Sequence, residues 1–194
     1  MHQERVAIFD LDRALFDAEP DITEAVNEVM HIHGLSHITR SEALCMMGDG
    51  LCVFAIRAFQ LRGMAAGEDE IAMFKARYGR RPTAQSKLYP GVLQALRTLV
   101  LEGWRMIVRT NQTEELALKI LRRLGIFHFF DAVYGEGAKE HRTSDPSHLE
   151  DAIARASLRS SGFSVMIGAH PADVLAARLR GRWPAEVATR SGHY

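Results

Sequence analysis

Two aspartates spaced one residue apart are the residues of this sequence best suited to chemistry. Asp10 and Asp12 directly follow the apolar run RVAIF at residues 5–9. Because side chains alternate between the two faces of an extended chain, both carboxylates are expected on the same side. Such a pair can divide a reaction between a nucleophile and a group that moves protons. Taken alone, such a pair is more often a solvated strand end or a helix cap than a catalytic site, so the surrounding elements decide its meaning.

Polar residues also follow the later apolar runs of the chain. In a parallel α/β sheet, ligands bind at the carboxyl ends of the strands, so such residues are candidates for the same site. They are Thr110 and Asn111 after RMIV, Arg142 in the segment RTSDP that opens a helical pattern, and Asp173 in the segment GAHPAD after SVMI. Thr110 could instead cap the helix that follows it.

The elements that must position these residues alternate regularly. Short apolar runs typical of buried strands occur at residues 5–9, 105–108, 131–134, 164–167 and, more weakly, 185–188. Stretches with helical periodicity lie between them, at residues 91–101, 114–124, 146–157 and 172–179. Alternation of strand and helix predicts an α/β fold with a doubly wound, Rossmann-like parallel sheet.

Residues from about 20 to 78 interrupt this alternation. They contain only helical patterns, punctuated by glycines, and turn residues at Pro82 and Tyr89-Pro90-Gly91 lead back into the sheet pattern. We therefore expect an α/β core formed by residues 1–14 and 88–194, with an all-helical domain inserted at residues 15–87.

Composition excludes several classes of function. The 194 residues include 24 Lys and Arg and 24 Asp and Glu, without a basic stripe, which argues against a nucleic-acid partner. The apolar runs are too short to cross a membrane and no signal peptide is evident, so a cytoplasmic protein is expected. Cys45 and Cys52 lie in a helical pattern and are expected to be buried thiols.

The order of these segments resembles the four motifs of the haloacid dehalogenase superfamily, over residues 6–181. IFDLDRALFDAEPDI is similar to the phosphatase version of the first motif, and MIVRTNQ is similar to the second. The resemblance implies that Asp10 is the nucleophile and Asp12 the general acid and base. It also implies that the Thr110 hydroxyl and the Asn111 backbone bind phosphate, and that Mg²⁺ is held by Asp10, Asp12 and Asp173.

The helical insert narrows the resemblance to the phosphoglycolate phosphatases. The segments AVNEVMHIHGL, MGDGLCVFAIRAF and KLYPGVLQALRTL are similar to the helical cap and its exit in those enzymes. By this resemblance, residues 15–87 form a cap that closes over the site and excludes water. The implied partner is a small phosphorylated metabolite, with phosphoglycolate as the first candidate.

Three departures from the family pattern affect the expected catalysis. Thr143 and Ser144 stand where the family has Lys-Pro, and Ala169 stands where it has a metal-binding aspartate. Arg13 and Ala14 replace the usual Gly-Thr of the first motif. We expect reduced turnover, with Arg142 or Lys139 as candidates to supply the missing positive charge.

Other functions remain open at this point. The departures favour a catalytically inactive pseudo-phosphatase that serves as a binding or regulatory protein. A metal-free dehalogenase is opposed by Asp12, and a receiver domain is opposed by the helical insert. Because few residues follow the last candidate strand, a second copy could cover an apolar edge there and form a homodimer.

Overall fold

The computed structural model of the chain describes residues 5–136, 163–168 and 183–186. The chain divides into two compact units. One unit comprises residues 1–16 and 88–194 and is called the sheet unit below. The other comprises residues 17–87 and is called the helical unit. Among the helices that the structure describes, none is both long and apolar enough to span a membrane.

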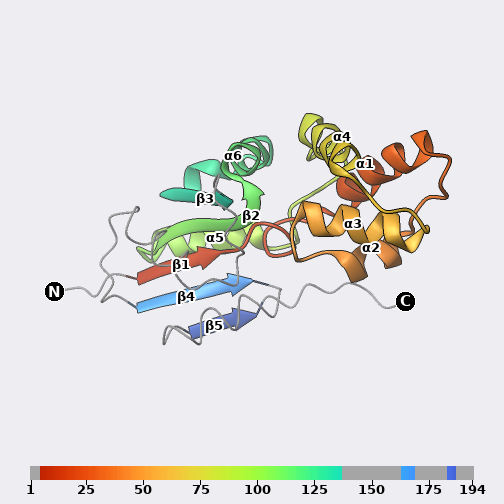
Figure 1. The fold of residues 1–194 in the computed structure, drawn as a ribbon. Coiled ribbons are helices and arrows are strands. Elements are labelled where there is room, and N and C mark those ends of the chain that lie inside the picture. Colours follow the sequence, from red (N-terminus) through yellow and green to blue (C-terminus); the bar gives the residue numbers. More distant parts are fainter. Residues whose placement is uncertain (1–4, 137–162, 169–182, 187–194) are drawn as a thin grey trace. The chain divides into compact units, whose positions relative to one another are not determined.

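The sheet unit contains a five-stranded parallel sheet with the order β3-β2-β1-β4-β5 (Figure 1). Its strands are β1 (Arg5–Phe9), β2 (Arg105–Thr113), β3 (Ala132–Glu136), β4 (Phe163–Gly168) and β5 (Trp183–Glu186). The central strand β1 is buried from Val6 to Phe9, as expected for a strand covered on both faces. The predicted parallel α/β fold is therefore confirmed.

Only β1 has the predicted bounds; β2, β3, β4 and β5 all differ from them, and the differences in β2 and β5 have clear physical reasons. β2 was expected to end at Val108 but continues to Thr113, because its polar residues still pair with β3. β5 begins at Trp183, two residues before the predicted start, and includes Pro184. Proline has no N–H to donate and is tolerated on an edge strand, which is the position of β5.

Two helices of the sheet unit lie within the described residues. Helix α5 (Val92–Leu101) follows Gly91, whose φ of 86° is easily adopted by glycine. Helix α6 (Glu114–Arg123) is capped by Thr113, whose Oγ1 accepts a hydrogen bond from the backbone N of Leu116 at 3.4 Å. The alternative that Thr110 caps this helix is therefore wrong. The helices predicted at residues 146–157 and 172–179 lie outside the described residues.

One face of the sheet carries an apolar cluster that the strands build by alternation. Val6 and Ile8 of β1 pack with Ile107 of β2 and Met166 of β4. The strand register places Ile8 directly beside both Ile107 and Met166. Residues two positions further along each strand therefore continue the same face toward the carboxyl end.

The helical unit consists of four helices: α1 (Glu19–Ile32), α2 (Arg40–Met46), α3 (Leu51–Leu61) and α4 (Glu68–Arg80). The short helix η1 (Phe127–Phe129) belongs to the sheet unit. Phe54, Phe59, Phe74 and Tyr78 are among the largest side chains in the interior of the helical unit. Cys45 lies on α2 and is exposed, and Cys52 lies on α3 and is partly exposed. The expectation of buried thiols on one helix was wrong, because a turn at Met47–Gly50 separates the two cysteines.

The buried carboxylate of Asp21 ties α1 to the end of the helical unit. Asp21 is 3% exposed and accepts hydrogen bonds from the backbone N atoms of Ala84, Gln85 and Ser86 at 2.8–3.2 Å. It also accepts one from the Ser86 hydroxyl. Because an ionised carboxylate has only acceptors, it satisfies all these donors at once.

Asp21→Asn should lower the free energy of unfolding by about 2 kcal/mol, because the new amide presents a donor to groups that are themselves donors. Urea denaturation of the two chains measures the difference. Asp69→Asn is the control, since Asp69 is exposed in the first turn of α4. If both variants change stability by the same small amount, the Asp21 cluster does not hold this unit together.

Candidate active site

Asp10 lies at the carboxyl end of the central strand. Its backbone N donates a hydrogen bond to the Ile167 carbonyl of β4 at 2.8 Å, so it extends the pairing of β1 by one residue. From β1 the chain adds β2 and β3 on one side and β4 and β5 on the other. Asp10 therefore lies at the topological switch point, where parallel α/β sheets bind ligands.

Asp12 has one partnered and one unpartnered carboxylate oxygen. Its Oδ2 accepts a hydrogen bond from Gln112 Nε2 at 2.8 Å, whereas Oδ1 is buried without a hydrogen-bond partner among the described residues. Burial raises the pKa of Asp12 to about 6, and the Gln112 hydrogen bond opposes this rise. A carboxyl group with such a pKa can both donate and accept a proton near neutral pH.

An irregularity in β2 brings Gln112 to Asp12. Arg109 pairs with Tyr134 and Thr113 pairs with Glu136, so four steps along β2 match two steps along β3. The two extra residues form a bulge that changes the directions of the side chains of Thr110, Asn111 and Gln112. Bulges of this kind often adjoin active sites because they redirect a side chain.

Thr110 stabilises the bulge from inside. Its Oγ1 accepts a hydrogen bond from the backbone N of Gln112 at 3.2 Å, and its side chain is buried. The hydroxyl hydrogen remains available for one donor bond. Asn111 is half-buried beside it. The structure thus brings four predicted residues, Asp10, Asp12, Thr110 and Asn111, to the carboxyl ends of two adjacent strands.

Gln112 is a site residue that the sequence reasoning missed. It is 2% exposed and contacts the predicted acid and base directly. The available signal was the polar run TNQT at the end of an apolar strand, which is unusual for a strand buried on both faces. The remaining predicted residues, Arg142 and Asp173, lie outside the described residues, as do Lys139, Thr143 and Ala169.

The residues present are compatible with a magnesium ion. Asp10 and Asp12 stand two residues apart at the carboxyl end of β1 and offer hard oxygen ligands of the kind that Mg²⁺ binds, while the unpartnered Oδ1 of Asp12 is left to carry a proton. Within the described part of the chain, no three His, Cys, Asp or Glu side chains gather as a metal centre. The third ligand implied by the sequence resemblance, Asp173, lies beyond that part.

Arg13 adopts a backbone conformation that favours glycine. Its φ is 65°, and it is the one non-glycine residue with positive φ among those that the structure describes. The Arg13 backbone N donates to the Phe16 carbonyl at 3.2 Å, which closes the tight turn after Asp12. The turn is kept although the residue there is not the usual glycine.

Arg13→Gly should therefore be more stable than Arg13→Ala by about 1 kcal/mol, because only alanine retains the strain of a left-handed Cβ. Thermal unfolding of the two variants at the same pH measures this difference. Equal stability would mean that the turn relaxes to a negative φ once the arginine side chain is removed.

Asp12→Asn should stabilise the chain in a pH-dependent way. The pKa of Asp12 is raised from 3.8 to about 6 in the folded state. Well below pH 3.8 the group is protonated in both states, and above pH 6 the folded state carries a buried charge. The unfolding free energy of the variant should therefore equal that of the natural chain at low pH. At pH 7.5 it should be higher by about 2 kcal/mol. Urea titrations in chelator at both pH values test this, and a constant difference would contradict it.

The comparisons with known proteins agree with this arrangement. Residues 7–182 match the family described as haloacid dehalogenase-like hydrolase. A phosphoglycolate phosphatase of Agrobacterium fabrum is 32% identical over 177 residues, which cover 89% of this chain and 76% of that protein. One from Cereibacter sphaeroides is 35% identical over 151 residues, covering 76% of this chain and 69% of the relative.

Solved structures show the same fold. The crystal structure of a predicted phosphoglycolate phosphatase from Haemophilus somnus superposes with a TM-score of 0.82 at 25% identity. The match covers 96% of this chain and 85% of the other. A protein from Lactobacillus delbrueckii also reaches a TM-score of 0.82 at 20% identity, over 95% of this chain and 86% of its own.

Proposed function

Because the chain belongs to the haloacid dehalogenase-like hydrolases, we propose that it hydrolyses small phosphomonoesters through a covalent phosphate on Asp10. The observation that carries this proposal is that two aspartates with different surroundings follow β1: Asp10 lies at the switch point, and Asp12, two residues later, has a pKa raised to about 6. The two carboxyl groups differ in role because their surroundings differ. Asp10 attacks, and Asp12 moves protons.

In the first step, an Asp10 carboxylate oxygen attacks phosphorus and the bond from phosphorus to the ester oxygen breaks. Asp12 in its acid form gives its proton to the departing alkoxide, which leaves as an alcohol. Gln112 Nε2 donates to Asp12 Oδ2, so the proton is best carried on Oδ1, which has no other partner among the described residues.

In the second step, water attacks the phosphorus of the aspartyl phosphate. Asp12, now ionised, takes the proton of that water, and the Asp10 carboxylate leaves as inorganic phosphate is released. One residue thus serves as acid and then as base, and a pKa near 6 suits both roles at neutral pH.

Mg²⁺ is the cofactor that we propose, held by Asp10, an oxygen of Asp12 and Asp173. When bound, it would neutralise negative charge on the phosphate oxygens. With Ala169 at the position of a further carboxylate ligand, the ion is expected to bind more weakly than in a complete site.

Phosphoglycolate is the substrate that the relatives favour. The helical unit is proposed to act as a cap that excludes water from the aspartyl phosphate before the hydrolytic step. Turnover is expected to be slow compared with those relatives, because Thr143 provides no positive charge.

A second function is favoured by the same substitutions. Thr143 and Ala169 together would leave a phosphate-binding protein that turns over nothing and regulates or recruits a partner. Its anion site would still contain the bulge at Thr110 and Asn111, since that bulge belongs to the sheet itself.

Phosphate release separates the two functions. The natural chain and an Ala169→Asp plus Thr143→Lys variant are assayed with phosphoglycolate and a small panel of phosphomonoesters, with Mg²⁺ or with chelator. Metal-dependent release by the natural chain supports the phosphatase. Release by the repaired chain alone would identify a phosphatase scaffold that has lost catalysis.

A further inference from the structure

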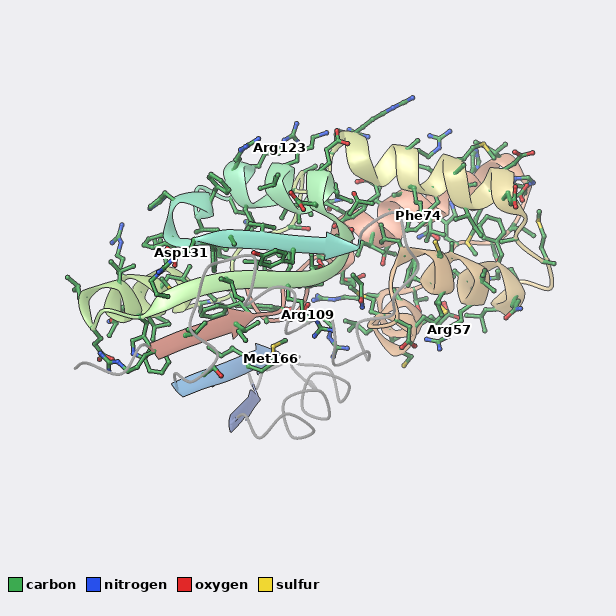
Figure 2. All side chains as sticks on the ribbon, turned by 60° about the vertical axis from the view of Figure 1, so that its left-hand side comes forward. Arg57, Phe74, Arg109, Arg123, Asp131 and Met166 are labelled. Atoms are coloured by element: carbon green, nitrogen blue, oxygen red, sulfur yellow. The ribbon has the colours of Figure 1, made fainter. Side chains whose placement is uncertain are left out.

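Gln112 is a buried amide whose backbone and side chain are both held in place. It lies in the β2 bulge that follows Arg109, a residue labelled in Figure 2. Its backbone N donates to Thr110 Oγ1 at 3.2 Å, and only 2% of the residue is exposed. Its Nε2 donates to Asp12 Oδ2 at 2.8 Å. A side chain fixed in this way can hold a second group in one orientation.

The orientation of the Gln112 amide follows from its partner. An ionised carboxylate has only acceptors, so Nε2, and not Oε1, must face Asp12. Oε1 is then buried without a hydrogen-bond partner among the described residues. A buried, unpaired acceptor is unfavourable, and an apolar side chain of the same length would avoid it. The amide is therefore best explained by what it does to Asp12.

The hydrogen bond from Gln112 makes the two oxygens of Asp12 unequal. Oδ2 is engaged by Nε2, whereas Oδ1 is buried with no hydrogen-bond partner in the described part of the chain. A proton on Oδ1 leaves Oδ2 as the acceptor that Nε2 requires. The same bond stabilises the ionised carboxylate, so it lowers the pKa of Asp12 against the larger, opposite effect of burial.

We propose that Gln112 is a positioning residue for Asp12: it presents Oδ1 as the oxygen that gives and takes the proton, and it keeps the buried carboxyl group able to ionise. This inference rests on the proposed phosphatase function, and Gln112 itself exchanges no proton. Without the Nε2 bond, the buried carboxyl group would hold its proton at neutral pH. The first step would still have its acid, but the hydrolytic step would lack its base.

The activity test compares Gln112→Met and Gln94→Met with the natural chain. Methionine is about as long as glutamine but has no amide, and Gln94 is the matched control because it is exposed on α5 of the same unit. For phosphoglycolate with Mg²⁺ at pH 7, Gln112→Met should lower kcat by about tenfold or more. The acid side of its kcat profile should move to higher pH, which a merely structural loss would not cause. Gln94→Met should match the natural chain in both respects.

Urea denaturation in chelator tests the same inference without activity. Asp12→Asn should gain unfolding free energy over the natural chain as the pH rises from 3.8 to about 6, because folded Asp12 ionises in that window. When Asp12→Asn is introduced into Gln112→Met, this gain should continue to a pH higher by about one unit, because the carboxylate has lost its donor. In Gln94→Met the window should be that of the natural chain.

These measurements separate the inference from the proposed function. If the natural chain releases no phosphate but the window moves in Gln112→Met, the phosphatase fails and the role of Gln112 stands. The inference is overturned if Gln112→Met, confirmed as folded by thermal unfolding, keeps the kcat profile of Gln94→Met or, in a chain without activity, keeps the same window. If Gln112→Met does not fold, Gln112→Glu decides the matter, because it keeps the shape but cannot donate when ionised. The same upward shift supports the inference, and an unchanged window overturns it.

Discussion

Asp10→Asn is expected to lower kcat for phosphoglycolate by at least about a thousandfold, because an amide cannot form the aspartyl phosphate. Asp10 extends β1 through a backbone hydrogen bond to Ile167, which the substitution leaves intact. The midpoint of thermal unfolding should therefore change little. Steady-state phosphate release and a thermal melt of the same preparation measure the two quantities.

Asp131→Asn is the control for this prediction. Asp131 belongs to the same unit, but its carboxylate accepts a hydrogen bond from the Met106 backbone N at 3.0 Å and pairs with Arg105. These contacts lie toward the amino end of the sheet (Figure 2). Asp131→Asn should reduce stability and preserve kcat. A similar kcat for Asp10→Asn and the natural chain would show that Asp10 is not the nucleophile.

Gly135→Ala is expected to lower the free energy of unfolding by at least about 3 kcal/mol, because the added methyl group meets backbone that cannot move aside. A Cβ at residue 135 would lie 2.2 Å from the Glu114 N and 2.5 Å from the Gln112 carbonyl oxygen. The clash falls on the bulge that aims Gln112 at Asp12, so activity should fall together with stability.

Gly79→Ala provides the opposite case with the same substitution. Gly79 lies in α4, and a Cβ added there meets nothing within 4 Å. Alanine favours the helix over glycine, so this variant should gain about 0.5 kcal/mol. Urea denaturation of both variants tests the contrast. Equal and small effects would mean that β3 shifts freely against the bulge.

The strands of the sheet could be predicted because each is a short apolar run. Residues 5–9 were predicted as a strand and form β1 with the same bounds, since a parallel strand buried on both faces excludes polar residues. β2 extends beyond its apolar part because backbone pairing does not require apolar side chains. The polar residues at the end of β2 belong to the candidate active site.

Of the candidate site, the sequence predicted the residues that belong to the family motifs but not their hydrogen-bond partners. Asp10 and Asp12 were identified from their spacing, but the partner of Asp12 depends on a bulge between strands far apart in sequence. Such a bulge is a property of register, which one strand alone does not reveal.

The buried state of Asp12 links stability to catalysis. The group that carries the proton is also the one whose ionisation is unfavourable in the folded chain. A chain improved for stability at this position would lose its acid and base. This trade between folding and function is common where an active site holds a charged group away from water.

The central claim is that phosphate becomes covalently attached to Asp10. The most direct test is to mix the chain with phosphoglycolate and Mg²⁺, quench in acid, and map any added phosphoryl group by peptide mass spectrometry. We expect one phosphoryl group on the peptide that contains Asp10 and none in Asp10→Asn. In Asp12→Asn, any phosphoryl group that forms should persist longer, because the hydrolytic step lacks its base. Release of phosphate without modification of Asp10, or a phosphoryl group on another residue, would contradict the account.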